Sequence, residues 1–377
     1  SPRPIRNVVH LEKRKKEKKA DYFFDAFAYR NALEIYHQEF KRNPDSFHVR
    51  ERIATCYFRL HDPVSAELWY RSLAAEEGVS PQVIFDYAEV LSMNGKYDES
   101  RRWFTEYLKR TPGDKVVRDK LDFLRDIPKY TSNEERFLVS TFDFNSRYAD
   151  YGAHFFHNGV VFGSSRDADF LIKRKPIDGL SPEESFVNLY YAERDDAGGW
   201  AKLAPFRSKE IETIYHEGPV AFYDHFRKCA FTQSNTKDGK PLYDGVGRVN
   251  LSIYFATVSP SGEFDQLVSF EHNSDAYSNA HPSFSADGNT MYFASTMPTG
   301  QGDSDLYYSI LKNGRWTDPE NLGEGVNTRR TESFPFIAND TTLYFSSNGH
   351  GGFGGLDLYV CYKRNGKFTK PINLGHP

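Results

Sequence analysis

Few side chains in this sequence stand at a spacing that is typical of catalysis or metal binding. The chain has no GxSxG nucleophile turn, no HExxH zinc helix, no GxxxxGK[ST] phosphate loop and no GxGxxG motif after a strand. His154 and His157 could share one strand region, but at i and i+3 they would point to opposite faces of a strand. We therefore expect no catalytic residues, no cofactor and no enzyme activity.

One acidic cluster, GDSDLYY at residues 302–308, offers the oxygen ligands that calcium prefers, from Asp303 and Asp305. Asp305 has a counterpart in Asp357, which precedes the same Leu-Tyr step, whereas Asp303 has none. A repeated position favours a structural role. We expect Asp305 to accept backbone N–H groups at a corner between loop and strand, and we predict no metal site, with calcium as the alternative.

The three cysteines, Cys56, Cys229 and Cys361, lie far apart and form no CxxC pair, so we expect buried thiols rather than zinc ligands. Their number does not decide the cellular compartment. The basic run RKKEKK at 14–19 contains Glu17, and we interpret it as the solvated side of an opening helix, with partner binding as the alternative.

Charge and hydropathy exclude two classes of partner. The chain balances 48 basic against 52 acidic residues, for a net charge of -4, so it lacks the positive field that holds nucleic acid or an anionic membrane. No apolar run approaches the roughly 20 residues that cross a bilayer. We expect a protein that is not transmembrane and that binds no nucleic acid.

The first third of the chain repeats every 34 residues, with small and aromatic residues returning at the same places. Four series share this spacing: Ala20, Ala54 and Ala88; Phe23, Tyr57 and Leu91; Ala32, Ala66 and Ser100; and Tyr36, Tyr70 and Phe104. A small residue lets two helices approach closely, and an aromatic residue fills the gap beside it. Pro44 and Pro112 end the first and third units, because proline blocks further helix. The pattern predicts three helix hairpins.

This pattern resembles the tetratricopeptide repeat over about residues 13–113, although the usual Trp position holds Lys16, Arg50 and Ile84, and Gly78 stands where Pro is expected. A helix over about 114–127 would cap the array, which gives a predicted domain at 13–127. The resemblance implies a concave groove, lined by first helices, that binds protein partners. Its positions fall on Asp21, Phe24, Asp25, Glu51, Thr55, Arg59, Phe85, Glu89 and Met93. Packing of the three repeats against the propeller or against another subunit is the alternative.

From about residue 131 the pattern changes to short alternating runs rich in Phe and Tyr, which favours strands. The best self-match is 52 residues: DLYYSILKNGRW (305–316) returns as DLYVCYKRNGKF (357–368). Asn313-Gly314 and Asn365-Gly366 predict two-residue hairpin turns. Two looser units, 151–206 and 218–264, precede these. Four antiparallel strands in each unit predict four blades of a β-propeller over 131–377, with the insertions 166–186 and 235–249 as surface loops.

The blade pattern P-x-F-S-x-D-G, then D-L-Y, then W-x-x-P-x-N-L-G resembles the WD40-like PD40 repeat. An α-solenoid followed by such blades is similar to the N-terminal part of the OmpA-family proteins of Bacteroidetes, including the PorE-like components of the type IX secretion system. That resemblance implies a periplasmic, outer-membrane-associated scaffold. Its partners would be secretion-complex or outer-membrane subunits, and peptidoglycan would be bound only through an OmpA-like domain that is absent here.

We therefore expect a non-enzymatic protein–protein interaction scaffold. The alternatives are a propeller that binds a peptide or a glycan, and an enzyme of unrecognised chemistry. Residues 136–142 look like a blade's final strand without its first three, so we also expect five or six blades in a longer protein, closed by a strand beyond Pro377.

Overall fold

The computed structural model describes residues 18–25, 28–132, 140–146, 148–166, 187–206, 215–245 and 247–376. Helices come first and antiparallel blades follow, so the predicted fold class is confirmed. The described residues form two compact units. The first runs to Ile127 and includes Gly351–Gly355, and the second holds the remaining residues from Pro128 onward.

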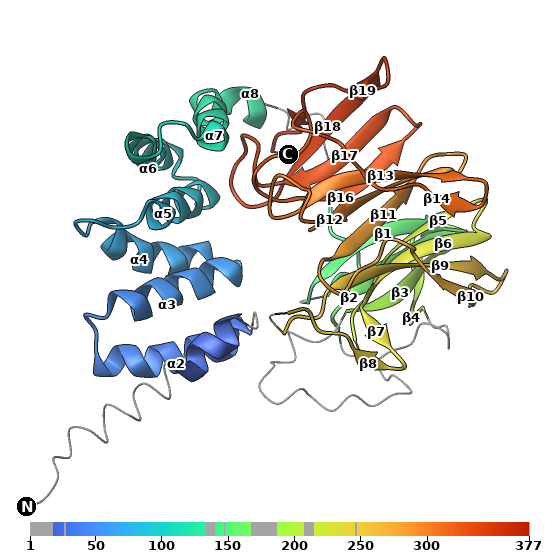
Figure 1. The fold of residues 1–377 in the computed structure, drawn as a ribbon, viewed down its shortest axis with the longest axis horizontal. Helices are drawn as coiled ribbons and strands as arrows, with labels where there is room; N and C mark the ends of the chain where they lie inside the picture. The colour runs from blue at the N-terminus through green and yellow to red at the C-terminus, as the bar shows by residue number, and fades with distance from the viewer. Residues whose placement is uncertain are drawn as a thin grey trace, which may run out of the picture. The chain divides into compact units, whose positions relative to one another are not determined.

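The helices of the first unit follow one another as antiparallel neighbours (Figure 1). Residues 18–25 are helical. The elements after them are α2 (Tyr29–Arg42), α3 (Phe47–Arg59), α4 (Pro63–Ala74), α5 (Pro81–Met93), α6 (Tyr97–Arg110) and α7 (Lys115–Arg125). The short α8 (Ile127–Thr131) follows and lies almost wholly in the second unit. Three pairs therefore precede Pro112, and α7 follows them. None of the described helices is long and apolar enough to cross a membrane.

Local sequence explains where these helices begin. The side chains of Ser46, Asp62, Ser80 and Asp114 each accept a hydrogen bond from a backbone N–H three residues on, which satisfies a donor that the first turn cannot pair. Pro63 and Pro81 stand at the first helical position, where the missing N–H costs nothing.

The 34-residue register determines the packing of the pairs. Two small-residue series have no exposed surface: Ala20, Ala54, Ala88, Ala32, Ala66 and Ser100. The aromatic series beside them, Tyr36, Tyr70 and Phe104, is at most 1% exposed. The Ser100 hydroxyl donates a hydrogen bond to the Ala88 carbonyl at 2.8 Å, so even the one polar member of the small series is satisfied. Helix contacts follow the predicted repeat.

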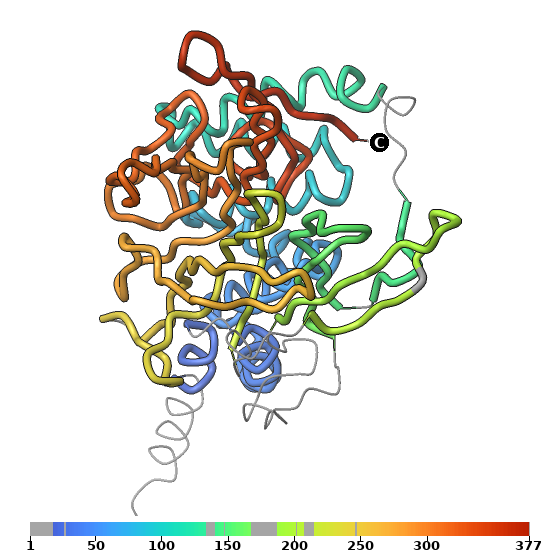
Figure 2. The backbone as a smooth tube through the Cα atoms, turned by 90° about the vertical axis from the view of Figure 1, so that its right-hand side faces the viewer, coloured from blue at the N-terminus to red at the C-terminus, as the bar shows by residue number. Residues whose placement is uncertain are grey.

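The second unit contains four antiparallel sheets that follow in chain order, and the tube of Figure 2 passes through them from green to red. Blade 1 holds β1 (Asp150–Phe156), β2 (Gly159–Ser164), β3 (Asn188–Arg194) and β4 (Trp200–Pro205). Blade 2 holds β5 (Glu217–Tyr223), β6 (Lys228–Ser234), β9 (Leu251–Val258) and β10 (Phe264–Ser269). A small hairpin, β7 (Thr236–Lys237) and β8 (Lys240–Pro241), lies in the predicted insertion at 235–249.

Blade 3 holds β11 (Asn279–Phe284), β12 (Thr290–Ser295), β13 (Asp305–Lys312), β14 (Arg315–Trp316) and β15 (Glu320–Asn321). Blade 4 holds β16 (Glu332–Ala338), β17 (Thr342–Ser347), β18 (Asp357–Arg364), β19 (Lys367–Phe368) and β20 (Ile372–Asn373). The arrangement is a four-bladed propeller, as predicted.

The predicted Asn-Gly turns form in blades 3 and 4. Asn313 and Gly314 have φ of 52° and 77°, and Asn365 and Gly366 have φ of 51° and 80°. These positive values are what a two-residue hairpin loop requires, because its twist then matches that of the flanking strands. Each loop joins strands in direct register.

The blades share an internal core contact that repeats from sheet to sheet. On the second strand of each blade a Phe faces a Tyr of the next strand, with ring centroids 5.7–6.1 Å apart. The four pairs are Phe162–Tyr190, Phe231–Tyr254, Phe293–Tyr307 and Phe345–Tyr359.

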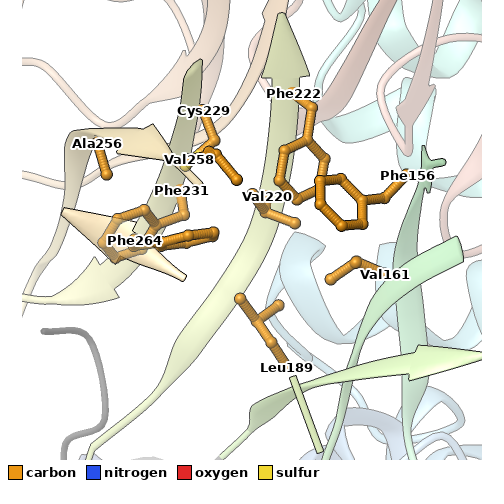
Figure 3. Close-up of a cluster of buried hydrophobic side chains, with 10 residues drawn as sticks. All are labelled: Phe156, Val161, Leu189, Val220, Phe222, Cys229, Phe231, Ala256, Val258 and Phe264. Carbon is orange, nitrogen blue, oxygen red and sulfur yellow. The ribbon is translucent and has the colours of Figure 1, made fainter. Parts of the chain in front are cut away.

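Neighbouring blades pack face to face. Figure 3 shows this core between blades 1 and 2, where Phe156 of β1 meets Phe222 of β5 at 4.5 Å.

Two predictions lie wholly or partly outside the described residues. The insertion 166–186 is described only at Arg166. Of the proposed orphan strand 136–142, only 140–142 are described, and they are not in a strand.

Candidate functional site

The first two helix pairs carry a polar cluster around Asp21, one of the predicted groove residues. Tyr36 donates its hydroxyl hydrogen to Asp21 Oδ1 at 2.5 Å, and His48 Nε2 lies 3.0 Å from the same oxygen. Burial, together with the Asp21 carboxylate, raises the pKa of Tyr36, so this phenol stays a donor. The aspartate is therefore held by partners from α2 and α3.

Arg52 of α3 stands beside this cluster. Its guanidinium lies 4.1 Å from the centroid of the Phe24 ring, and its Nε is 4.0 Å from Asp21 Oδ1, too far for a hydrogen bond. The buried Arg52 Nε has no hydrogen-bond partner among the described residues, although a third of the side chain is exposed. A ligand with a carbonyl or carboxylate oxygen would suit this guanidinium.

A second chain of hydrogen bonds joins α3, α4 and α5. Thr55 Oγ1 lies 3.1 Å from Tyr70 Oη, which donates to Asp86 Oδ2 at 3.4 Å. Gln82 donates to the other Asp86 oxygen at 2.7 Å. Hydroxyl, carboxylate and amide groups of α3, α4 and α5 are thus linked through Tyr70, which is fully buried.

The predicted groove residues differ in exposure. Asp25 and Arg59 are exposed, and the partly exposed members are Asp21, Phe24, Glu51, Thr55 and Met93. Phe85 and Glu89 are only 4% exposed. Phe85 packs on Phe104 and Tyr107, and Glu89 pairs with Lys120. The accessible residues therefore come mainly from the first two pairs, and the partner-binding role of the nine residues stays a prediction.

Arg52, His48 and Tyr36 were missed by the sequence reasoning. The groove positions of the tetratricopeptide pattern do not show that Asp21 contacts side chains of two other helices, α2 and α3. The spacing of His48 and Arg52, four residues apart on one helix face, was the available signal.

A second candidate site is a cavity of about 710 Å³ in the propeller. Its walls are mainly aromatic, and the lining includes Phe142, Phe144, Tyr151, Phe155, Val160, Phe162, Trp200 and Phe336. Phe144 stacks on Phe162 at 5.2 Å and meets Trp200 edge-on at 4.9 Å. The sequence reasoning did not find this cavity, because its walls come from blade 1, from the segment before it and from blade 4.

The residues that the sequence analysis considered for metal binding or catalysis make contacts that belong to the fold. Asp305 accepts the backbone N–H groups of Gln301 and Gly302 at 2.7 and 3.1 Å, and the Asn321 amide at 2.7 Å, which confirms the role predicted for it. His154 Nδ1 lies 2.9 Å from the Phe155 carbonyl, and His157 occupies a turn with φ of 47°. In the described part of the chain, no three His, Cys, Asp or Glu side chains gather as metal ligands.

The cysteines are buried free thiols, as predicted. Burial raises the pKa of Cys56 and of Cys361 to about 12 and also raises that of Cys229. A thiol whose pKa is raised in this way carries little thiolate near neutrality, so these side chains serve the core.

Comparison with known proteins gives the chain no family. No family model matches it, and no curated protein does. Among solved structures, the second TPR domain of the human RPAP3 protein, in complex with an HSP70 peptide, is 18% identical; the match covers 31% of this chain and 98% of that one, with a TM-score of 0.28. A Mycobacterium tuberculosis puromycin-hydrolyzing peptidase is 16% identical over 56% of this chain, with a TM-score of 0.31, and the match spans 29% of its length.

An α-L-arabinofuranosidase from Lactobacillus brevis is 11% identical over 60% of this chain and 76% of its own, with a TM-score of 0.36. Likeness at this level transfers no activity, substrate or partner to the chain. Function has to be argued from its own residues.

Proposed function

We propose that this protein is a non-enzymatic scaffold whose tetratricopeptide-like helices bind a segment of a protein partner. The observation that carries the proposal is the cluster at the first two helix pairs. There the Arg52 guanidinium lies over Phe24, and its Nε, 4.0 Å from Asp21 Oδ1, has no hydrogen-bond partner among the described residues. A backbone carbonyl or a carboxylate of a bound peptide would accept a hydrogen bond from the exposed part of that guanidinium, and the exposed residues Asp25 and Arg59 would select partners by charge.

The wider setting that we propose is a complex of the bacterial envelope, periplasmic and associated with the outer membrane. The support is the arrangement of helical repeats followed by PD40-like blades, which is similar to OmpA-family proteins of Bacteroidetes and to PorE-like components of type IX secretion. In such a complex the partners would be secretion or outer-membrane subunits. Peptidoglycan would be reached through an OmpA-like domain outside this sequence.

The test compares two charge-reversed variants with the same net charge. The groove variant carries Asp25→Lys and Arg59→Glu, at exposed positions of the first helices. The control carries Glu99→Lys and Arg102→Glu, at exposed positions of α6. Each protein would be used to capture proteins from a detergent-solubilised Bacteroidetes envelope and, separately, from the cytoplasmic fraction, and the Kd of every purified candidate would then be measured.

We expect a partner that binds the wild type and the control alike and binds the groove variant at least tenfold more weakly. Equal affinity for all three proteins would contradict the role of the groove. Partners confined to the cytoplasmic fraction would contradict the envelope setting.

A further inference from the structure

The exposed side of α4 carries a row of uncharged residues. The buried side of this helix holds Ala66, Tyr70 and Leu73, which have no exposed surface. Residues three and four apart lie on one helix face, and the row that faces away from that buried side is Val64, Leu68, Ser72 and Ala75. All four are exposed, Val64 at 66% and Leu68 at 64%. We call these four residues the α4 row.

At the places of the α4 row, the neighbouring helices α2 and α6 carry charged residues, apart from one glutamine. In α2 these are Arg30, Glu34, Gln38 and Lys41, and in α6 they are Asp98, Arg102, Glu106 and Lys109, each 34 residues from its counterpart in α4. Single exposed apolar side chains are ordinary on a protein surface. A complete uncharged row, at places where both neighbouring repeats carry charges, is typical instead of a surface that another molecule covers.

Contacts place α4 between these two helices. Trp69 of α4 meets Phe40 of α2, with ring centroids 4.8 Å apart. Glu67 of α4 accepts hydrogen bonds at 2.7 and 2.8 Å from Lys96, the residue before α6. The uncharged row is therefore flanked on both sides by charged rows. An apolar centre inside a polar rim is the usual anatomy of a protein–protein interface.

The charges of the two flanking rows run in opposite order. Along α2 a cation precedes an anion, Arg30 and Glu34, whereas along α6 an anion precedes a cation, Asp98 and Arg102. A twofold axis along α4, in the plane of this face, would place α2 of a second copy on α6 of the first, with the helices parallel. Arg30 would then meet Asp98 of the second copy. Glu34 would meet its Arg102, and symmetry makes each pair occur twice.

The remaining charges are compatible with this arrangement. Asp98 pairs with Arg101 at 2.8 Å, but an exposed carboxylate can accept hydrogen bonds from two cations. Lys41 would meet Lys109 of the second copy at the end of the rows, where both side chains are exposed and salt screens their repulsion.

We propose that a second copy of this chain packs against the α4 row in a twofold symmetric dimer. The two rows would meet at the centre, where the small side chains of Ser72 and Ala75 let the α4 helices approach closely. A second copy fits better than an unrelated protein, because the chain itself supplies the complementary order of charges. The groove residues lie on the first helices of the pairs, whereas α4 is a second helix, so the dimer and the groove can each fail alone. Arg102→Glu in the control of the groove test would weaken the dimer and leave the groove unchanged.

Sedimentation velocity of the full chain over a series of concentrations measures the dimer. One helix row buries less area than a standard interface, so we expect a Kd on the order of 1–100 µM for the wild type. The interface variant is Val64→Ser with Leu68→Ser, and the control variant is Tyr243→Ser with Val268→Ser, which removes side chains that are 61% and 58% exposed in the propeller unit. We expect a Kd about tenfold higher, or more, for the interface variant and an unchanged Kd for the control. Circular dichroism at a concentration well below the wild-type Kd checks the fold of each variant as a monomer.

A charge exchange tests the twofold arrangement. In Arg30→Asp the new carboxylate would face Asp98 of the second copy, and in Asp98→Arg the new guanidinium would face its Arg30. We expect each single variant to dimerise about fivefold more weakly than the wild type, or worse. In an equimolar mixture of the two variants every reversed charge meets an opposite charge, so the mixture should associate about as tightly as the wild type. Because the same two proteins are measured alone and together, a folding defect cannot produce this recovery.

Three results would overturn the proposal. A wild type that stays monomeric at the highest concentration would leave the α4 row to a different protein. A serine variant that dimerises as tightly as the wild type would place the contact elsewhere. A mixture that associates no better than its two components would show that α2 and α6 of different copies do not face each other.

Discussion

The helical repeats and the blades both stack one unit on the next, yet they end in different ways. After the last helix pair, α7 turns a nearly complete apolar face inward: Val116, Val117, Phe123 and Leu124 are at most 7% exposed. The terminal blades instead leave Phe155, Phe336 and Leu358 half exposed or more. A repeat array needs a polar outer cap to remain soluble, and a terminal face without one is typical of a surface that binds something. In this structure α7 covers the end of the helical array, whereas the outer faces of blades 1 and 4 keep exposed apolar side chains.

The sharpest test of this comparison uses two equivalent phenylalanines. Phe222→Ala removes a ring that is 6% exposed and packs on Phe156, so we expect a loss of about 3–5 kcal/mol in the free energy of unfolding. Phe155→Ala changes the equivalent position of blade 1, where the ring is 72% exposed, and should cost no more than about 0.5 kcal/mol. Urea unfolding of both variants measures the difference. Similar losses would show that the first blade is covered after all.

The capped end of the helical array contains a buried ion pair. Lys120 Nζ of α7 lies 2.9 Å from Glu89 Oε1 of α5, and the two side chains are 2% and 5% exposed. Lys120→Ala would leave a buried carboxylate without its cation, so we expect a loss of about 3–5 kcal/mol in the free energy of unfolding. The double substitution Lys120→Met with Glu89→Gln should recover most of it, as thermal melting at 222 nm would show. A double variant as unstable as the single one would mean that the charge pair is not what matters.

The contact between paired helices leaves no room for a larger side chain. Ala66 of α4 has no exposed surface, and overpacking a close helix contact typically costs 1–3 kcal/mol. We expect Ala66→Trp to destabilise the array by about 3 kcal/mol, and Leu68→Trp on the same helix, where the side chain is 64% exposed, to leave the helical melting curve nearly unchanged. Equal melting of the two variants would contradict the register.

Much of the fold could be predicted from the repeat period and from turn residues in the sequence. Ala20 and Ala88 stand 68 residues apart, two periods of the repeat, and both are fully buried, because close helix packing accepts only small residues at those places. The Asn-Gly turns followed from their need for positive φ. Features of this kind can be read from a single sequence because each depends on residues that lie near one another or recur at a fixed period.

The sites were harder to predict, for a physical reason. Phe85 falls on a groove position of the repeat that the sequence resembles, but its ring packs on Phe104 and Tyr107. Its place in the repeat therefore did not determine how exposed the side chain is. Phe155 and Phe222 stand in the same blade pattern, and only the presence or absence of a neighbouring blade separates a surface ring from a core ring. Exposure at a seam depends on which sheets meet, and no local pattern contains that information.

The last prediction compares one position in two blades. Asp150 opens the first strand of blade 1 and Glu332 that of blade 4. Burial alone would raise the pKa of Asp150, but hydrogen bonds from Ser164, Arg166 and Ser146 outweigh it and hold that pKa low. The Glu332 carboxylate accepts hydrogen bonds from Thr328 and Ser347 rather than from an arginine, and burial raises its pKa from an ordinary value of 4.5 to about 7.

An acid whose pKa is higher in the folded state holds its proton more tightly there, so protonation favours folding. The contribution of Glu332 to stability is therefore fully present below about pH 4.5 and is lost as the pH rises to about 7. We expect the loss of this contribution to lower the free energy of unfolding by on the order of 1–3 kcal/mol as the pH rises from 5 to 8. Glu332→Gln should remove this slope, and subtracting its urea-unfolding profile from that of the wild type cancels the groups that titrate in both proteins. Parallel profiles would mean that Glu332 stays ionised in the fold, held by its hydroxyl and backbone donors as Asp150 is by its own.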